Sequence, residues 1–261
     1  MIFETHAHYD DAQFDEDREM LLSGMQEAGI GRIVNIGADL KSTEGSIRLA
    51  EQYDFIYAAV GVHPSDVRQL NEETFAWLSE QAKRPKVLAI GEIGLDYYWE
   101  KDPEERANQQ YWFRRQLGLA RDLRLPVVIH SREAAKDTMD IAVEEHMGEI
   151  GGVVHCYSYS VEMARDYLNM GMYLGIGGVL TYKNSRVLKE VVAYAPMDRL
   201  VLETDSPYLT PVPHRGKRNS SLNLPYVVQA IAQIKGLTPE EVEEITWGNA
   251  ERMYRMALPQ K

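Results

Sequence analysis

The sequence predicts an α/β protein that folds as a single (β/α)8 TIM barrel over residues 1–261. Short apolar or β-branched runs alternate with longer amphipathic segments along the chain, and no linker or low-complexity tract interrupts them. Eight such runs occur, as a closed parallel barrel requires. Side chains that can bind metals follow many of these runs, and only a barrel brings the ends of so many strands together at one rim.

The expected elements follow one another in barrel order. The runs that predict strands are 1–3, 32–36, 55–60, 87–90, 127–129, 152–154, 172–176 and 200–202. Helical periodicity predicts helices at 17–28, 43–53, 72–82, 103–123, 132–147 and 161–169. Segment 238–256 opens with Thr238, Pro239 and two glutamates, which form an N-cap and a first turn. We therefore expect one extra C-terminal helix, packed on the outside.

Composition bounds the class of protein. Hydrophobic residues make up 44% and charged residues 26% of the chain, as in an ordinary globular protein with a sizeable core. The net charge of −12 argues against a protein that grips long duplex nucleic acid by broad phosphate neutralisation. A pocket that holds divalent cations reverses the local field, so a phosphate-containing substrate is compatible with this charge.

The sequence predicts a cytoplasmic protein. The first residues lack a basic segment followed by an apolar run, and no stretch approaches about 18 uninterrupted apolar residues. The single cysteine, Cys156, excludes an intramolecular disulfide and fits a reducing compartment. We expect no membrane contact and no stable protein partner.

Histidine placement is the most informative feature of the sequence. Five of the seven histidines, His6, His8, His63, His130 and His155, lie at or just past the end of an expected strand. His6 and His8 are two residues apart, so on a regular strand both side chains point to one face and can bind one cation. A single strand-end histidine is typically a hydrogen-bonded core or loop residue, whereas the whole set indicates a metal centre.

Carboxylates complete the expected centre. Glu92 follows an apolar strand, where an unpaired buried charge is costly, and its two oxygens can bridge two cations roughly 3.5–4 Å apart. Asp205 suits both a metal ligand and a base that takes a proton from water. Glu203 is expected to hydrogen-bond a ligand histidine, and Asp96 is interpreted as an exposed loop residue or a similar partner of a histidine. Asp39 also closes a strand.

Candidate phosphate-binding residues surround this centre. His63 is expected to contact substrate phosphate or to protonate a leaving oxygen. Arg215 and Lys217 lie in the basic loop 214–218 after the eighth strand, a frequent phosphate-binding region in barrels, although a solvated loop has the same composition. Arg132 can clamp phosphate with two hydrogen bonds.

Rim aromatics and a glycine-rich segment each have two interpretations. Tyr97, Tyr98, Trp99, Tyr157 and Tyr159 can stack on bases, but aromatic residues in barrel loops more often serve packing. Segment 175–178 lacks the lysine of a phosphate-binding loop, so we interpret its glycines as strand-end geometry.

Six short motifs lie at the expected strand ends. They are Thr5-His6-Ala7-His8, Gly61-Val62-His63-Pro64, Gly91-Glu92-Ile93-Gly94-Leu95-Asp96-Tyr97, Val128-Ile129-His130-Ser131-Arg132, Val154-His155-Cys156-Tyr157-Ser158 and Glu203-Thr204-Asp205-Ser206-Pro207-Tyr208. In this order and spacing they resemble the TatD family of metal-dependent deoxyribonucleases. The resemblance spans nearly the whole chain, and its most specific motifs are 91–97 and 203–208.

The resemblance implies a barrel fold and hydrolysis of phosphodiester bonds in DNA by water that two divalent metal ions activate. The positions that match the family's metal ligands are His6, His8, Glu92, His130, His155 and Asp205, and His63 matches a residue near the reacting phosphate. The expected catalytic residues are Asp205, Glu92 and His63, and the expected substrate contacts are His63, Arg132, Arg215 and Lys217. Because the chain is acidic, we expect exonucleolytic action on single-stranded ends.

The chain departs from the family pattern in three places. Glu4 stands where the family usually has aspartate, and Ser158-Tyr159 stands where it has Ser-Gly, which we expect to narrow the pocket mouth. Segment 218–225 differs from the family's usual Arg-Asn-Glu-Pro, as though residues had been inserted. These departures bear on substrate preference more than on chemistry.

Two alternative functions stay open on the sequence alone. Related barrels of the amidohydrolase type cleave carboxylic esters or amides, and many of them bridge their metals with a carboxylated lysine, whereas this chain offers Glu92. The second alternative is a non-catalytic metal-binding or interaction protein, against which the complete ligand set argues. The ligands do not fix the metal, since magnesium, manganese and zinc are all compatible.

Overall fold

A computed structural model describes residues 1–256 as a barrel of eight parallel strands. The strands are β1 (Ile2–Ala7), β2 (Ile30–Ile36), β3 (Ile56–Val60), β4 (Val87–Asp96), β5 (Val127–Arg132), β6 (Gly152–Val154), β7 (Tyr173–Ile176) and β8 (Leu200–Leu202). Each strand pairs with the next one in the sequence, so the sheet order runs from β1 to β8. The predicted (β/α)8 fold is confirmed.

Contacts between the first and last strand regions close the sheet. Ala7 forms a parallel bridge with Ser206, and the amide of His8 donates to the carbonyl of Ser206 at 2.8 Å. The amide of Asp205 donates to the carbonyl of His6 at 3.0 Å. The hydrogen bonds that close the barrel therefore also bring His6, His8 and Asp205 together.

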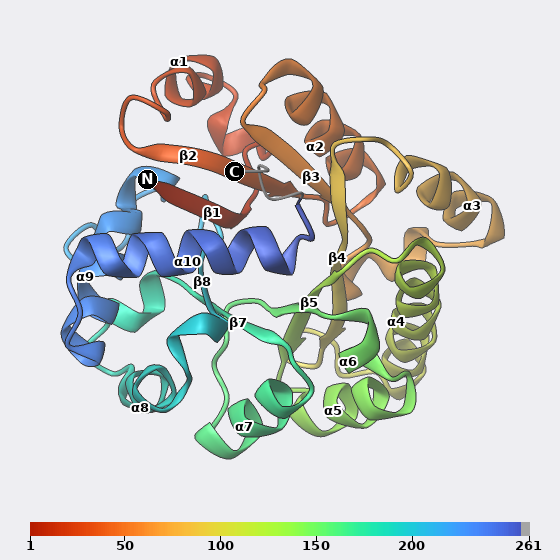
Figure 1. The fold of residues 1–261 in the computed structure, drawn as a ribbon. Helices are drawn as coiled ribbons and strands as arrows, with labels where there is room; N and C mark the ends of the chain where they lie inside the picture. Colours follow the sequence, from red (N-terminus) through yellow and green to blue (C-terminus); the bar gives the residue numbers. More distant parts are fainter. Residues whose placement is uncertain (257–261) are drawn as a thin grey trace.

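Helices surround the barrel (Figure 1). They are α1 (Arg18–Ser23), α2 (Leu40–Gln52), α3 (Glu72–Gln81), α4 (Pro103–Leu123), α5 (Ala135–Glu144), α6 (Met147–Ile150), α7 (Val161–Asn169), α8 (Arg186–Tyr194), α9 (Leu224–Lys235) and α10 (Pro239–Met253). Helices α4 and α7 have the predicted bounds. The helix expected over 132–147 is shorter than predicted: it begins later because β5 continues to Arg132, and it ends before His146, which takes a left-handed backbone conformation with φ 51° and precedes the separate helix α6.

Two layers of apolar side chains stabilise the fold. The larger layer lies between the strands and the helices and includes Leu22, Phe113 and Tyr167. The smaller layer contains at least one residue from each of the eight strands, which can meet only inside the barrel: Phe3, Val34, Ile36, Ala59, Ala89, Val128, Val153, Tyr173 and Val201. The barrel is thus a packed core at this level and not a channel.

The C-terminal helix closes one end of the barrel. Ala250 on α10 and Met253 and Tyr254 at its end belong to the inner layer. The side-chain amide of Asn249 donates to the carbonyl of Leu200, the first residue of β8, at 2.7 Å, and α10 crosses the strand ends in Figure 1. The predicted extra helix is present, but its packing on the outside was wrong: it covers the N-terminal ends of the strands and completes the inner core.

Strands β1, β4 and β5 continue beyond their apolar runs. β4 reaches Asp96 and β5 reaches Arg132, so Glu92 and His130 lie within strands instead of after them. The pairing of β4 with β5 shifts in register between Ile90 and Ile93. Such irregularities re-aim side chains, and this one flanks Glu92.

Among residues 1–256, no helix combines the length and the apolar character that a membrane span needs. The single-domain organisation expected for 1–261 stays a prediction, and residues 257–261 lie outside the described part of the chain.

Replacing Asn249 by alanine should destabilise the protein. Asn249 is fully buried, and its amide donates to the carbonyls of Met197 and Leu200, both at 2.7 Å. Because two carbonyls lose their donor, the free energy of unfolding in urea should fall by about 2–4 kcal/mol. Glu244→Ala, an exposed change on the same helix, should alter it by no more than about 0.5 kcal/mol. Equal unfolding curves for the two variants would contradict the role given to Asn249.

Candidate metal centre

The predicted ligands converge at the end of the barrel opposite α10. All six lie in the C-terminal halves of strands or just after them: His6, His8, Glu92, His130, His155 and Asp205. A ring nitrogen of each of the histidines 6, 8, 63, 130 and 155 lies within 3.8 Å of a Glu92 oxygen. The structure therefore brings the predicted set together around one carboxylate.

The two oxygens of Glu92 face different histidines. Oε2 lies 3.3 Å from His6 Nε2 and 3.8 Å from His8 Nε2. Oε1 lies 2.7 Å from His130 Nδ1 and 3.0 Å from His155 Nε2. A carboxylate that presents one oxygen to each of two nitrogen groups has the arrangement needed to bridge two cations.

The surroundings of Glu92 keep it ionised. The residue is only 4% exposed. Burial alone would raise the pKa of its carboxyl, but His155, His130 and His6 hold that pKa well below its usual range. The centre thus carries a fixed negative charge at its middle.

His6 and His8 present their Nε2 atoms to the same place. These atoms are 3.1 Å apart and lie 3.6 and 3.4 Å from Asp205 Oδ1. His8 Nδ1 lies 2.9 Å from the carbonyl of Ile36, which can only accept, so Nδ1 carries the hydrogen and Nε2 keeps its lone pair for a cation. The prediction that the two histidines share a face is confirmed.

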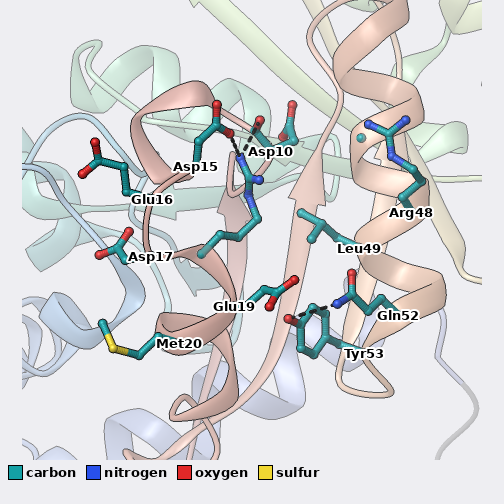
Figure 2. A pocket seen from close by; sticks show the side chains of 12 residues that line it. Asp10, Asp15, Glu16, Asp17, Glu19, Met20, Arg48, Leu49, Gln52 and Tyr53 are labelled. Carbon is teal, nitrogen blue, oxygen red and sulfur yellow. Dashed lines mark hydrogen bonds and ion pairs between the residues drawn. The ribbon is translucent and has the colours of Figure 1, made fainter.

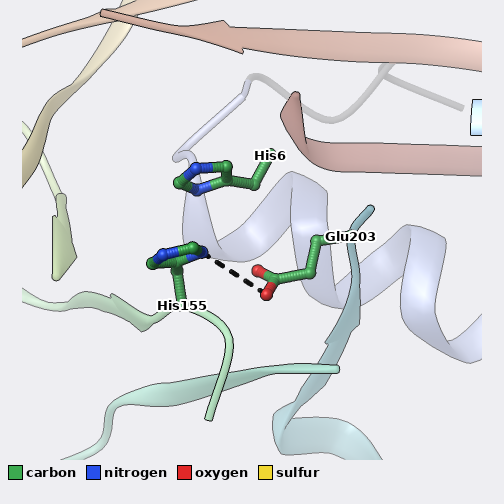
Figure 3. Close-up of side chains that lie close together, drawn as sticks. All are labelled: His6, His155 and Glu203. Carbon is green, nitrogen blue, oxygen red and sulfur yellow. Dashed lines mark ion pairs between the residues drawn. The ribbon is translucent and has the colours of Figure 1, made fainter. Parts of the chain in front are cut away.

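His155 stacks on His6, with Glu203 beside the pair (Figure 3). The ring centroids are 3.9 Å apart and the planes differ by 13°. Glu203 Oε1 lies 3.5 Å from His155 Nδ1 and accepts the amide of Cys156 at 2.5 Å. Gly175 makes room for this carboxylate, since a Cβ there would collide with it, which confirms the structural interpretation of the glycine-rich segment. Glu203 thus forms an ion pair with His155, whose Nε2 faces Glu92, but the predicted hydrogen bond between Glu203 and the histidine is not formed.

His130 lies between two carboxylates. Its Nδ1 is 2.7 Å from Glu92 Oε1, and its Nε2 is 3.2 Å from Asp96 Oδ2. Asp96 is only 2% exposed, so its interpretation as an exposed loop residue was wrong, whereas the partnership with a histidine is confirmed. A carboxylate behind a histidine fixes the ring orientation.

Two buried glutamines of α4 fix the backbone beside the centre. Gln109 accepts the amide of Asp96 at 3.0 Å and donates to its carbonyl at 3.3 Å. Gln116 accepts the amide of Val62 at 2.8 Å and donates to its carbonyl at 3.1 Å, directly before His63. Sequence reasoning missed both residues. The available signal is their spacing of seven, which places two amides on one helix face.

Asp205 is held in a left-handed backbone conformation. Its φ is 58°, its amide donates to the carbonyl of His6, and its carbonyl accepts the amide of Tyr208 at 2.8 Å. Aspartate tolerates this region better than most residues. The Asp205 side chain is 19% exposed against 5% for Glu92, so it is the more accessible of the two central carboxylates.

His63 has the geometry of a hydrogen-bond donor. Its Nδ1 accepts the amide of Ser65 at 3.1 Å, which leaves the ring hydrogen on Nε2. Nε2 lies 3.8 Å from Glu92 Oε1 and points into the centre. Burial and the neighbouring His130 lower the pKa of His63 to about 3, so the ring is neutral at pH 7.

The donor set fits divalent metal ions. Ring nitrogens and carboxylate oxygens gather within 4.8 Å of one another in three groups, of which the first two share His6: His6, His155 and Glu203; His6, His8 and Asp205; and His63, Glu92 and His130. The two Nε2 atoms at 3.1 Å repel each other unless a proton or a cation lies near both. Mixed imidazole and carboxylate donors are typical of zinc, manganese and other first-row metals.

In the basic loop 214–218, Arg218 forms an ion pair with an acidic residue, whereas the side chains of Arg215 and Lys217 form none within the described part of the chain. Arg218 pairs with both carboxylate oxygens of Asp17, at 2.8 and 2.5 Å, and so ties the loop after β8 to the loop after β1. The Arg215 guanidinium lies 4.3 Å from the Tyr182 ring centroid. Arg215 and Lys217 are exposed, and no acidic group of residues 1–256 pairs with either.

Two other predicted residues lie outside the histidine cluster. Asp39 caps α2, where its carboxylate accepts the amide of Ser42 at 2.6 Å. Arg132 is exposed at the end of β5, with its guanidinium carbon 3.9 Å from the Tyr98 ring centroid. Arg132 therefore belongs to the rim and not to the centre.

Two departures from the family pattern contact each other. Ser221, in the segment 218–225, donates from Oγ to Glu4 Oε2 at 2.9 Å and also bonds the Tyr9 hydroxyl at 2.8 Å. Glu4 Oε1 accepts the amides of His6 and Thr204 at 3.1 and 2.9 Å. Burial raises the pKa of Glu4 to about 8 despite these donors. Glu4 and the segment 218–225 thus form one buried network beside β1.

The third departure, Tyr159, is anchored behind the rim. Its hydroxyl lies 2.9 Å from Ser131 Oγ, which also bonds Thr138 Oγ1 on α5 at 2.8 Å. The Tyr159 hydroxyl thus contacts β5 and the start of the segment that leads to α5, and the expected narrowing of the pocket mouth stays a prediction.

A cavity of about 490 Å³ lies between α1 and α2, and no histidine is among the residues that line it (Figure 2). Its lining includes Asp10, Asp15, Asp17 and Arg18. Arg18 is already held by Asp15 at 2.6 Å and by the carbonyl of Tyr9 at 2.5 Å. Since none of the six predicted ligands lines this cavity, we do not place the reaction there.

Comparison with known proteins agrees with this geometry. Residues 3–255 match the family described as TatD related DNase. The chain is 44% identical over 256 residues to the uncharacterized metal-dependent hydrolase YabD of Bacillus subtilis, which covers 98% of this chain and 100% of the relative. It is 33% identical over 259 residues to a protein of Cronobacter sakazakii named 3'-5' ssDNA/RNA exonuclease TatD, with 97% of both chains covered.

A solved structure has the same fold. The crystal structure of the TatD homologue YJJV from Escherichia coli K12 superposes with a TM-score of 0.91 at 28% identity, and the match covers 98% of each chain. The sequence match and the structural match both extend over almost the entire chain. The chain therefore belongs to the TatD family of metal-dependent hydrolases.

Proposed function

We propose that the protein hydrolyses phosphodiester bonds in single-stranded DNA, starting from an end of the strand. The observation that carries the proposal is the position of Glu92, whose two oxygens face two sets of histidines. Two-metal centres with such a bridging carboxylate are typical of phosphodiester cleavage. The name of the Cronobacter sakazakii relative, a 3'-5' ssDNA/RNA exonuclease, supports the same class of substrate.

The proposed cofactors are two divalent ions, which we expect to be magnesium, manganese or zinc. The residues that would hold them are His6, His8, Glu92, His130, His155 and Asp205. When bound, such ions polarise the phosphate, lower the pKa of water and stabilise charge on the leaving oxygen. Glu203 and Asp96 keep the rings of His155 and His130 oriented.

Asp205 is the proposed proton acceptor. Its carboxylate is accessible, and its Oδ1 lies 3.4 Å from His8 Nε2 and 3.6 Å from His6 Nε2. As the oxygen of water bonds to phosphorus and the bond to the leaving oxygen breaks, Asp205 can take the proton that the water loses. His63 is proposed to donate from Nε2 to a phosphate oxygen, because its neutral ring carries the hydrogen there.

The charge distribution favours strand ends over duplex interiors. The chain carries a net charge of −12, which repels a long polyanion. The expected phosphate contacts Arg132, Arg215 and Lys217 are exposed, but they are too few for broad phosphate neutralisation. They suffice to hold the phosphates of a short single-stranded segment.

A metal-supplemented assay should therefore favour single strands. We expect faster release of nucleotides from the ends of a single-stranded oligonucleotide than from the blunt duplex of the same sequence, and loss of activity on chelation with recovery on added metal. Carboxylic esters and amides serve as the comparison substrates. Faster cleavage of the duplex, or turnover of esters and amides only, would reject the proposal. Activity that survives chelation would reject the metal centre.

Glu92→Ala should empty the centre. Removal of the bridging charge should lower bound divalent metal from roughly two equivalents to less than one, as measured by elemental analysis after gel filtration. Glu44→Ala, an exposed change on α2, should retain the wild-type metal content. Full metal content in a folded Glu92→Ala protein would show that Glu92 does not bridge the ions.

Asp205→Asn and the rim cations should affect different kinetic constants. Asp205→Asn keeps the shape but removes the proton acceptor, so kcat should fall on the order of a hundredfold or more with metals still bound. Arg215→Ala and Lys217→Ala should chiefly raise KM, because both cations bind phosphate in the ground state and the transition state alike, and this effect should shrink at high salt. Near-normal kcat in metal-loaded Asp205→Asn would show that Asp205 is not the proton acceptor.

A further inference from the structure

Two neighbouring aromatic side chains at the rim are exposed. Trp99 is 69% and Tyr98 40% exposed, and their ring centroids are 4.7 Å apart in an edge-to-face arrangement. They follow β4, three and two residues beyond Asp96. An exposed aromatic alone needs no explanation, but an adjacent pair beside a candidate reaction centre indicates a ligand contact.

The backbone under this pair is fixed. Asp96 Oδ1 accepts the amides of Tyr98 and Trp99 at 2.9 and 3.1 Å, and Asp96 Oδ2 contacts His130 Nε2 at 3.2 Å. The carbonyl of Tyr97 accepts from Lys101 Nζ at 2.6 Å. One carboxylate therefore joins the aromatic pair to the metal centre. Because the pair is already rigid, few rotatable bonds of the protein lose their freedom when a ligand binds, and the entropic cost of binding is small.

Arg132 adds a cation to the pair. Its guanidinium carbon lies 3.9 Å from the Tyr98 ring centroid and 5.7 Å from that of Trp99. No carboxylate within residues 1–256 pairs with Arg132, so its hydrogen-bond donors stay available for a phosphate. Arg132 and His130 are two residues apart on β5, which places the cation next to the centre.

We propose that Trp99 stacks on the base of the nucleotide next to the scissile phosphate. Arg132 then binds the phosphate on the far side of that same nucleotide. This inference rests on the proposed nuclease function and names a recognition element for it. A base inside a duplex has both faces covered by its neighbours and cannot stack on an indole, so the contact favours single strands. Every base has a π-face, so the contact tolerates any sequence.

The test compares wild type with Trp99→Ala, Trp99→Phe and a control, Tyr194→Ala, an aromatic that is 50% exposed on α8. The substrates are a thymidine oligonucleotide and an abasic oligonucleotide of the same length, with manganese present. Trp99→Ala should raise KM for the thymidine oligonucleotide roughly 5- to 100-fold and leave kcat little changed. It should not raise KM for the abasic oligonucleotide. Trp99→Phe should recover much of the loss, and Tyr194→Ala should behave as wild type.

The outcomes separate this inference from the nuclease proposal. An unchanged KM in Trp99→Ala, or an equal rise in KM for both substrates, would overturn the stacking contact. Cleavage of the oligonucleotides by wild type would still support the nuclease proposal in that case. If wild type cuts neither substrate, fluorescence anisotropy with phosphorothioate versions of both oligonucleotides decides. Weaker binding of only the base-bearing one by Trp99→Ala would then support stacking although the nuclease proposal had failed. Absence of binding by wild type would reject both.

Discussion

The burial of one carboxylate governs the architecture of the centre. Glu92 is 4% exposed, and a charge so far from water is costly unless opposite or polar groups surround it. Five imidazoles within 3.8 Å meet this need, and they come from or follow four different strands. Only a closed parallel barrel delivers side chains from so many strands to one point, so the chemistry and the topology impose the same requirement.

Support for the histidines extends one layer outward. Glu203 stands behind His155 in the space that Gly175 leaves, and Asp96 stands behind His130. Gln109 in turn holds the backbone of Asp96 by both its amide and its carbonyl. Ring orientation is therefore set by buried, hydrogen-bonded neighbours before any ion binds, which limits the reorganisation that binding requires.

The spacing of apolar residues predicts the eight strands and most helices, because the buried face of each element requires apolar side chains at regular intervals in the sequence. It does not predict that β4 and β5 extend to Asp96 and Arg132, since charged, polar and glycine residues interrupt the apolar pattern there and pairing with neighbouring strands holds these segments in the sheet. The histidines stand out because they are few and placed at strand ends. Gln109 and Gln116 do not, because their partners are backbone groups distant in sequence. Amphipathicity shows that α10 has a buried face but not which surface it covers.

The position of α10 affects when this protein can fold during synthesis. Ala250, Met253 and Tyr254 complete the inner layer of the barrel, yet the ribosome adds them after all eight strands. A nascent chain can pair its strands earlier, but the N-terminal end of its barrel stays open. Phe3 and Val201 of the inner layer then lack the apolar side chains of α10 that pack in the same layer. Folding must finish after the segment beyond β8 has left the ribosome. Stalled or truncated chains will therefore present an apolar opening that chaperones and proteases can recognise.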